Sequence, residues 1–293
     1  LGLSMGTGQE RAVQWESPRE ECGVFGIYAL GEDVARLTFF GLYALQHRGQ
    51  ESAGIATSDG HRLYLHTRMG LVNTAFTEED LRRLPGHIAI GHTRYSTTGS
   101  SVPVNAGPFL VREGIEPVAV AHNGNLVNSE QLRQELLAKG IPLAGTTDTE
   151  ALTWVLALTP GSDLATRIRR AMGRFLGAYS LAILTPRALA AVRDPLGIRP
   201  LCLGRLGAGW VVASETCALA TIGATFEREV EPGEIVVIDA EGLRSYPAPE
   251  LAERQATCIF EFIYFARPDS QMMGRRLHIV RQRMGMELWR EHP

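Results

Sequence analysis

The chain has 293 residues, of which 45% are hydrophobic and 21% charged, a composition typical of a globular protein. Its net charge of −3 shows no basic excess, so we expect no nucleic-acid or membrane partner. No apolar run is long enough to span a bilayer, and the first 21 residues lack the apolar block of a signal peptide. The four cysteines form no C-x-x-C pair, which argues against a disulfide framework and predicts a reducing, cytoplasmic location; they are Cys22, Cys202, Cys217 and Cys258.

Short apolar segments bounded by Gly, Pro or Asp predict strands along most of the chain. In chain order they are residues 23–30, 53–59, 62–67, 87–95, 117–124, 179–185, 189–194, 210–215 and 234–240. Helical patterns occupy residues 33–46, 128–138, 149–158 and 163–175. Asn128 followed by Gln131 resembles a capping box, and Gly140 is a stop signal. Two groups of strands with helices between and after them predict an α+β fold, in which two sheets carry helices on their outer faces.

A change of composition at residues 245–254, where two prolines follow the last strand, predicts a domain boundary. A strand-like stretch, "CIFEFIYFARP", and a basic helical stretch, "GRRLHIVRQRMGMELWREH", come after it. One strand and one helix cannot form an independent core. This segment therefore either begins a second domain or packs on the first.

Cys22 opens an apolar strand and has two readings. A small buried thiol is the commoner role for a cysteine. Three features favour a nucleophile instead: Gly23 and Gly26 allow close approach of other backbone, the preceding segment looks dispensable, and cleavage after Glu21 would give Cys22 a free α-amine. Such an amine has a pKa of about 7.7–8.0, which suits a general base. An N-terminal amine that activates its own side chain is an established arrangement for Thr.

Two arginines lie where they are suited to bind a carboxylate. Arg48 lies at a turn that ends a helix, where it is either a solvated surface charge or a clamp for a carboxylate. Arg94, Thr97 and Thr98 lie in a loop after a strand and together suit the carboxylate of a small amino acid. Taken alone this loop is weak evidence, because polar loops are common.

Three further residues could bind charged groups of a substrate or of a reaction intermediate. "HNGN" usually reads as a turn, but Asn123 and Gly124 also offer an amide and a backbone N–H to a developing oxyanion. Asp148 either complements a helix dipole or pairs with a substrate ammonium group. The eight histidines form no H-E-x-x-H zinc pattern, and the sequence contains no Walker A loop or dinucleotide fingerprint.

Together these motifs resemble one family. "CGVFGIY", "LQHRGQESAGIA", "GHTRYSTTG", "AHNGNLVN" and "TTDTEAL" have the order and spacing of the class II glutamine amidotransferases. "VRDPLGIRPL" and "IFEFIYFARPDS" resemble the amidophosphoribosyltransferase branch, and the resemblance runs from about Glu21 to the last residue. It implies a four-layer αββα N-terminal nucleophile fold. It also implies a leader at 1–21, a glutaminase domain at 22–250 and the start of a phosphoribosyltransferase domain at 251–293.

The resemblance also implies a role for each candidate residue. These roles are Cys22 as the nucleophile, Asn123 and Gly124 as the oxyanion hole, Arg94 and Thr97 on the glutamine α-carboxylate, Asp148 on its α-ammonium, and Arg48 near the glutamine site. Cys258 matches the first cysteine ligand of a [4Fe–4S] cluster in leader-bearing relatives, with a buried thiol as the equal alternative. Cys202 and Cys217 are expected to be structural.

The function implied is hydrolysis of L-glutamine, with the ammonia converting phosphoribosyl pyrophosphate into 5-phosphoribosylamine, the first step of purine biosynthesis. The phosphoribosyltransferase half would use Mg²⁺, and the full-length family forms homo-oligomers. We expect this chain alone to retain the glutaminase half, and little activity until the leader is removed. The alternatives are the glutaminase part of another class II amidotransferase, a non-catalytic glutamine-binding module, and a cysteine protease. The protease is disfavoured because no Cys–His pair with an orienting Asn is evident.

Overall fold

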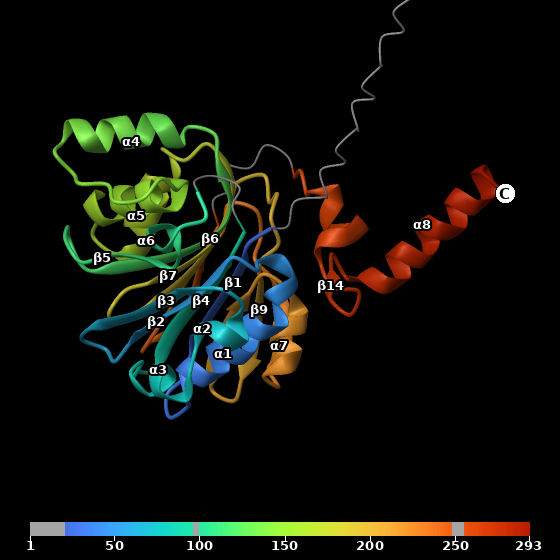
Figure 1. Cartoon of the computed structure of the whole chain (residues 1–293), viewed down its shortest axis with the longest axis horizontal. Helices are drawn as coiled ribbons and strands as arrows, with labels where there is room; N and C mark the ends of the chain where they lie inside the picture. The colour runs from blue at the N-terminus through green and yellow to red at the C-terminus, as the bar shows by residue number, and fades with distance from the viewer. Residues whose placement is uncertain (1–20, 96–99, 248–254) are drawn as a thin grey trace, which may run out of the picture.

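The fold is a stack of two antiparallel sheets between two layers of helices (Figure 1). A computed structural model describes residues 21–95, 100–247 and 255–293. Within these ranges, one sheet has seven strands in the order β11-β9-β10-β1-β4-β2-β3, and the other has six in the order β13-β12-β8-β7-β6-β5. This arrangement confirms the expected αββα fold.

Each sheet combines strands that are distant in the sequence. The seven-stranded sheet consists of β1 (Gly23–Tyr28), β2 (Ser52–Ser58), β3 (Leu63–Met69), β4 (Ile88–Arg94), β9 (Cys202–Leu206), β10 (Gly209–Ala213) and β11 (Thr225–Glu229). The six-stranded sheet consists of β5 (Phe109–Val111), β6 (Val118–Leu126), β7 (Gly177–Leu184), β8 (Leu189–Arg193), β12 (Ile235–Asp239) and β13 (Gly242–Tyr246). The central position of β1, between β10 and β4, places residue 22 at the buried end of a sheet.

Helices cover the outer face of each sheet. Those beside the seven-stranded sheet are α1 (Val34–Ala44), α2 (Val72–Ala75), α3 (Glu78–Arg82) and α7 (Thr216–Thr221). Those beside the six-stranded sheet are α4 (Ser129–Ala138), α5 (Asp148–Leu158) and α6 (Leu164–Met172). Short 3₁₀ turns follow α1 at η1 (Gln46–Arg48) and precede β5 at η2 (Pro103–Asn105).

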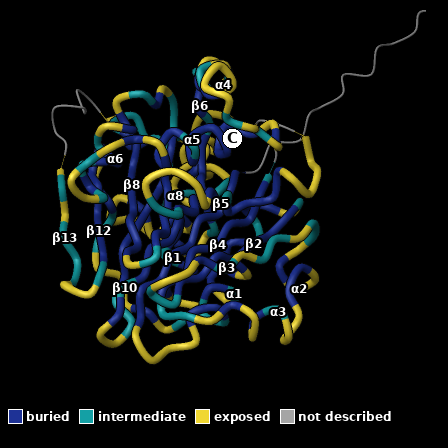
Figure 2. The backbone as a smooth tube through the Cα atoms, turned by 90° about the vertical axis from the view of Figure 1, so that its left-hand side faces the viewer, coloured by how far each residue is buried: buried dark blue, intermediate teal, exposed yellow. Residues whose placement is uncertain are grey.

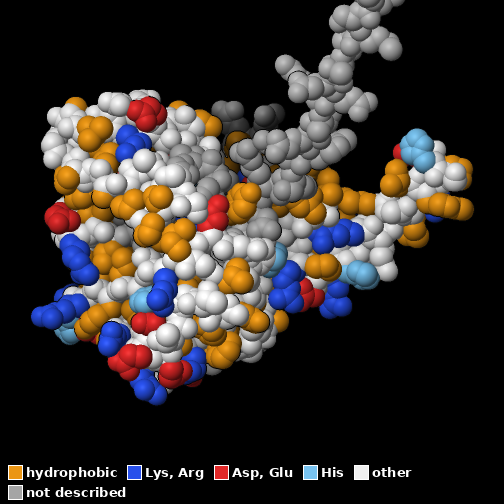
Figure 3. Space-filling model, viewed as in Figure 1, with side chains coloured by type: hydrophobic (Ala, Val, Ile, Leu, Met, Phe, Trp, Pro, Cys, Tyr) orange, Lys and Arg blue, Asp and Glu red, His pale blue; other side chains and the backbone are white. Residues whose placement is uncertain are grey.

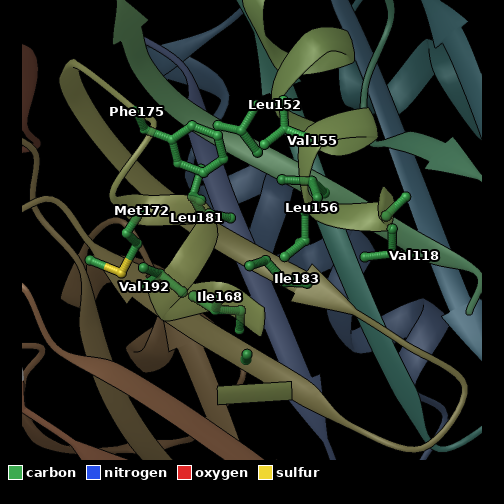
Figure 4. Packing of buried hydrophobic residues seen from close by; sticks show 14 of the residues in the cluster. Val118, Leu152, Val155, Leu156, Ile168, Met172, Phe175, Leu181, Ile183 and Val192 are labelled. Carbon is green, nitrogen blue, oxygen red and sulfur yellow. The ribbon is translucent and has the colours of Figure 1, made fainter. Parts of the chain in front are cut away.

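The buried apolar side chains form a separate layer at each interface. One cluster fills the space between the six-stranded sheet and its helices, and Figure 4 shows part of it, with Phe175 and Leu152 packed above Leu181. A second cluster lies under α1 and α7, and a third lies between the sheets. Buried backbone accordingly runs through the centre of the molecule, with exposed residues at its rim (Figure 2). On the face seen in Figure 3, Lys and Arg side chains are interspersed with Asp and Glu.

Strand β6 shows how alternation separates two of these layers. Val118 and Val120 pack under the helices, whereas Ala119 and Ala121 face the other sheet. Continuing this period of two along the same strand puts residue 123 on the side that faces the other sheet.

The C-terminal segment differs from the sequence prediction. "CIFEFIYFARP" is not a strand, because residues 259–265 are helical and η4 (Glu261–Phe265) is a π-helix. Its approach to the body uses isolated backbone bonds from Cys258 N to Ile198 O and from Ala256 N to Leu196 O. A two-stranded hairpin, β14 (Gln271–Met272) and β15 (Arg275–Arg276), leads into α8 (Leu277–Glu291), which extends away from the sheets (Figure 1).

The other predicted elements have mixed outcomes. All nine predicted strands and the five helical segments are confirmed, with ends shifted by a few residues. The capping box at Asn128 is wrong, because its side chain instead donates to Arg174 O and accepts from Leu176 N, while Gln131 donates to Glu135. The leader, apart from Glu21, and most of the predicted boundary segment lie outside the described residues. No helix in the described ranges is long and apolar enough to cross a membrane.

Two helical glycines test the packing of α1 on the sheet. A Cβ on Gly41 would lie 2.3 Å from Cε2 of the fully buried Phe25, whereas a Cβ on Gly285 in α8 meets nothing within 4 Å. We expect Gly41→Ala to destabilise the fold by about 1–3 kcal/mol despite the higher helix propensity of Ala. Gly285→Ala, the matched control, should not lower the thermal midpoint. Equal midpoints for the two variants in thermal unfolding would contradict the packing described here.

Candidate active site

Four of the predicted site residues line one small cavity at the ends of the strands. They are Cys22 immediately before β1, Arg94 at the end of β4, Gly124 in β6 and Asp148 at the start of α5. The cavity has a volume of about 20 Å³, which is room for about one water molecule. Binding of an amino acid therefore requires the lining to move. Thr97, with Thr98, lies outside the described residues.

Cys22 is held in a dry environment. Its side chain is 7% exposed, and Sγ lies 3.5 Å from the Tyr95 carbonyl oxygen, to which the thiol donates. Burial raises the pKa of the Cys22 thiol to about 12, so the group is neutral near pH 7. Attack by this sulfur therefore needs a base that removes the thiol proton.

Asn123 is completely buried, and neither its Oδ1 nor its Nδ2 has a hydrogen-bond partner among the described residues. Buried amides are almost always paired, because an unmade hydrogen bond costs about 1–3 kcal/mol. An unpaired amide on the strand that brings Gly124 to the cavity is a feature of a ligand site rather than of a stable core. This observation supports the predicted oxyanion role, which remains a prediction.

Asp148 is fixed at the N-terminus of α5. The Thr147 side chain caps the helix by accepting from Glu150 N at 3.2 Å, and Asp148 Oδ2 accepts from Leu126 N at 2.9 Å. The second bond ties the helix start to the end of β6. A buried carboxylate at a helix N-terminus is stabilised by the helix dipole, so it can serve as a preorganised acceptor.

Arg94 is buried and forms an ion pair with Glu51, with Nη1 and Oε2 3.1 Å apart. The pair fixes the guanidinium at the cavity wall. Arg94 and Asp148 thus bring one charge of each sign to the lining, as the two charged ends of a free amino acid require.

Arg48 does not line this cavity, and its expected role needs correction. The side chain is 1% exposed, and its guanidinium donates to Glu215 Oε1 at 2.5 Å and to Glu261 Oε1 at 2.6 Å. Its Nε donates to the carbonyl oxygen of Cys22 at 3.2 Å. Arg48 does clamp carboxylates, as its planar fork suits, but they belong to the protein itself. We therefore treat Arg48 as a positioning residue for Cys22.

Two histidines at the cavity were considered in the sequence only as zinc ligands. Burial lowers the pKa of His92 to about 3, and its Nε2 lies 3.0 Å from the His122 carbonyl oxygen. His122 Nδ1 lies 3.1 Å from Thr149 Oγ1. A neutral His92 donates to that carbonyl and so steadies β6 next to Gly124. The two histidines come together because β4 of one sheet packs against β6 of the other, and no sequence pattern reports this packing.

Comparison with known proteins agrees with this geometry. Residues 92–221 match the family model described as "Glutamine amidotransferase domain". The amidophosphoribosyltransferase of Synechococcus elongatus is 52% identical over 95% of this chain and 57% of its own length, and that of Mycobacterium tuberculosis H37Rv is 47% identical over 98% and 55%. The chain thus carries a glutamine amidotransferase domain and is similar to amidophosphoribosyltransferases over nearly its whole length.

Solved structures show the same relationship. Glutamine phosphoribosylpyrophosphate amidotransferase of B. subtilis, complexed with ADP and GMP, superposes with a TM-score of 0.83 at 40% identity, covering 90% of this chain and 57% of that one. A structure described as the allosteric regulatory enzyme of purine biosynthesis gives 0.86 at 41% identity, covering 92% and 58%. The chain thus spans between half and two thirds of the length of these amidophosphoribosyltransferases.

The described residues include no complete site for either of the two inorganic groups that the resemblance implies. No group of three or more His, Cys, Asp or Glu side chains in the described ranges is arranged to hold a metal ion. Cys202 and Cys217 belong to the apolar cluster under α1 and α7, and Cys258 is partly exposed in the C-terminal segment. A four-cysteine cluster therefore cannot be completed from these cysteines, and Cys258 as a ligand remains a prediction.

The pKa of Cys22 predicts slow alkylation while the Glu21–Cys22 peptide bond is intact. With a thiol pKa of about 12, roughly one thiol in ten thousand is ionised at pH 8. The rate of iodoacetamide labelling at Cys22 should therefore rise tenfold for each pH unit between 7 and 10. Peptide mapping of the uncleaved chain measures this rate, with the partly exposed Cys258 as internal comparison. A labelling rate at Cys22 that levels off below pH 10 would rule out the strongly raised pKa.

Arg48 provides a stability prediction. Arg48→Met leaves the buried carboxylates of Glu215 and Glu261 without their main partner, and breaking a buried ion pair costs about 3–5 kcal/mol. Denaturant unfolding should show a loss of this size. Arg205→Met, which removes an arginine stacked on Trp210, is the matched control and should cost about 1 kcal/mol or less. Similar losses in both variants would show that the Arg48 network contributes little.

Proposed function

We propose that this chain hydrolyses the side-chain amide of L-glutamine, with Cys22 as the nucleophile. The observation that carries the proposal is that one cavity is lined by Cys22, by the cation Arg94 of β4 and by the anion Asp148 of α5. Arg94, with Thr97, would bind the α-carboxylate, and Asp148 would bind the α-ammonium. A substrate held at both charged ends presents its side-chain amide to the sulfur, and this proximity lowers the barrier.

The chemistry follows from the state of Cys22. Once the preceding residues are removed, its α-amine takes the thiol proton, and the thiolate attacks the amide carbon. The resulting oxyanion accepts hydrogen bonds from the Gly124 N–H and the unpaired Asn123 amide. The amine then returns the proton as the carbon–nitrogen bond breaks and ammonia leaves. Water finally hydrolyses the thioester, which releases glutamate and restores the thiol.

For the whole protein we propose the family's activity. The ammonia would convert phosphoribosyl pyrophosphate into 5-phosphoribosylamine for purine biosynthesis, in the cytoplasm and within a homo-oligomer. That half of the reaction, with its Mg²⁺, would use the part of the relatives that this chain does not span. We accordingly assign 1–21 as a leader, 22–250 as the glutaminase domain and 251–293 as the start of the phosphoribosyltransferase domain, where Cys258 is the candidate [4Fe–4S] ligand.

Glutamine hydrolysis tests the proposal directly. A chain that begins at Cys22 should release ammonia from glutamine, and Cys22→Ala should abolish this release. Asp148→Asn should lower kcat/KM by roughly 10–100-fold, chiefly through KM, because it removes the charge that pairs with the substrate ammonium.

Asp163→Asn is the matched control for this substitution. Asp163 is an exposed N-cap of α6, and Asn caps helices as well as Asp does, so activity should be unchanged. Glutamine binding without hydrolysis in the wild type would favour the non-catalytic alternative. Hydrolysis retained in Cys22→Ala would refute the assigned nucleophile.

A further inference from the structure

The peptide bond between Glu21 and Cys22 is held by an arginine on each side. Arg199 Nη2 donates to Glu21 Oε1 at 2.6 Å, and Arg48 Nε donates to the Cys22 carbonyl oxygen at 3.2 Å. The Arg48 contact is buried, because Arg48 is 1% exposed. The contact between Glu21 and Arg199 is partly buried, with 10% and 14% of the two side chains exposed. The residue before the nucleophile is therefore as firmly placed as the nucleophile itself.

A third carboxylate ties the two arginines together. Glu261 Oε1 lies 2.6 Å from Arg48 Nη2 and 3.8 Å from Arg199 Nη1. The Arg199 guanidinium also lies 5.9 Å from the centre of the Phe265 ring. Because both arginines share one buried anion, neither can turn without disturbing the other. The carbonyl groups on the two sides of residue 22 are thus held in a fixed relative orientation.

The contact between Glu21 and Arg199 requires the Glu21 carboxylate to lose most of its hydration. Burial raises the pKa of the Glu21 carboxyl, and the positive charge of Arg199 opposes this rise. Among the described residues, Glu21 supplies the hydrogen-bond acceptor for Arg199, whose Nε and Nη1 have none. If the leader is removed, the mature chain does not contain this carboxylate. A partly buried ion pair that the mature chain would lose is best explained by a role before the leader is removed.

We propose that Arg199 is a positioning residue for removal of the leader by Cys22 itself. Held by its side chain, Glu21 keeps its carbonyl carbon within reach of the Cys22 sulfur. The inference rests on the proposed function in one respect, that Cys22 is a nucleophile. It adds a specificity rule: an acidic residue is required immediately before Cys22.

The reaction is an acyl shift followed by hydrolysis. The Cys22 sulfur attacks the Glu21 carbonyl carbon through a five-membered ring, the carbon–nitrogen bond breaks, and the thiol proton ends on the freed α-amine of Cys22. Water then attacks the thioester, which leaves the leader with a C-terminal carboxyl group at Glu21 and restores the thiol. No oxidant, metal or second protein is needed. The rate depends on how often the carbonyl and the sulfur adopt the reactive geometry, which is what the two arginines restrict.

Time-resolved intact mass after cell-free synthesis of the full chain tests the inference. Wild type should convert to a species that begins at Cys22. Glu21→Gln and Arg199→Gln should each slow this conversion by roughly tenfold, as expected for loss of one partly buried charged hydrogen bond. The double variant should be no slower than the slower single variant, because both substitutions remove the same contact. Arg199→Lys should recover part of the rate.

Two controls separate positioning from general damage. Arg187→Gln alters an exposed arginine in the turn between β7 and β8 and should process at the wild-type rate. Glu21→Gln loses its substitution with the leader, so its mature product is identical to the wild type and must have the same activity. Arg199→Gln made directly with Cys22 at its N-terminus needs no processing, so its rate of glutamine hydrolysis measures separately how far the substitution disturbs the Arg48 network around Cys22.

The outcomes that would overturn the inference are distinct from failure of the proposed function. Wild-type processing rates in both single variants, or additive slowing in the double variant, would show that the contact does not guide cleavage. A wild-type chain that is never cleaved would also overturn the inference, even if the version made with Cys22 first hydrolyses glutamine. Arg199-dependent cleavage without glutamine hydrolysis would support the inference and refute the proposed function.

Discussion

The buried guanidinium of Arg48 is the contact on which the arrangement of this site depends. It joins the Cys22 carbonyl oxygen, at the start of β1, to Glu215 before α7 and to Glu261 in the C-terminal π-helix. Burial disfavours the ionised form of Glu215. The charge of Arg48 and the hydrogen bond from His47 nevertheless hold the pKa of Glu215 below its usual range. A buried charge cluster is stable only when every member is satisfied, because each unpaired charge costs several kcal/mol. Order at Cys22 is therefore coupled to the docking of the C-terminal segment.

The C-terminal segment is held on the body largely by polar contacts. The apolar cluster of the C-terminal segment contains Ala266, Met272 and Leu277, with Phe262 packed against it, which is too little to hold the segment by burial alone. Glu215 supplies what the apolar contacts lack, since it accepts from Arg267 N and from the Ser270 hydroxyl. A segment bound through shared carboxylates can transmit a change of its own position to the nucleophile, because Arg48 contacts both.

Local patterns in the sequence predicted the layers of the fold, but they could not predict contacts between residues that are distant in the sequence. Alternation and turn residues located nine strands, but β5, β9, β11 and β13 were missed. β5, β11 and β13 lie at sheet edges, and neither β11 nor β13 has a buried residue. The aromatic residues of "IFEFIYF" suggested a strand, yet the segment forms a π-helix in which Glu261 is buried against Arg48. The partners of Arg48 lie 167 and 213 residues away, and no spacing rule identifies such pairs. The cavity residues Cys22, Arg94, Gly124 and Asp148 were predicted because each lies within a short sequence motif.

Removal of the leader would change the electrostatics of Cys22 in two ways at once. Burial is the main reason that the thiol pKa is raised, and the negative charge of Glu21 adds to it. Cleavage would take that charge away and place an α-amine on the same residue, whose pKa of about 7.7–8.0 allows it to accept the thiol proton near neutral pH. The same burial that keeps the thiol neutral in the longer chain would then favour hydrolysis of glutamine, since water is excluded and the dipoles around the reacting amide are fixed. A dry, preorganised site can therefore be built before it is active, and a single peptide bond determines when its chemistry begins.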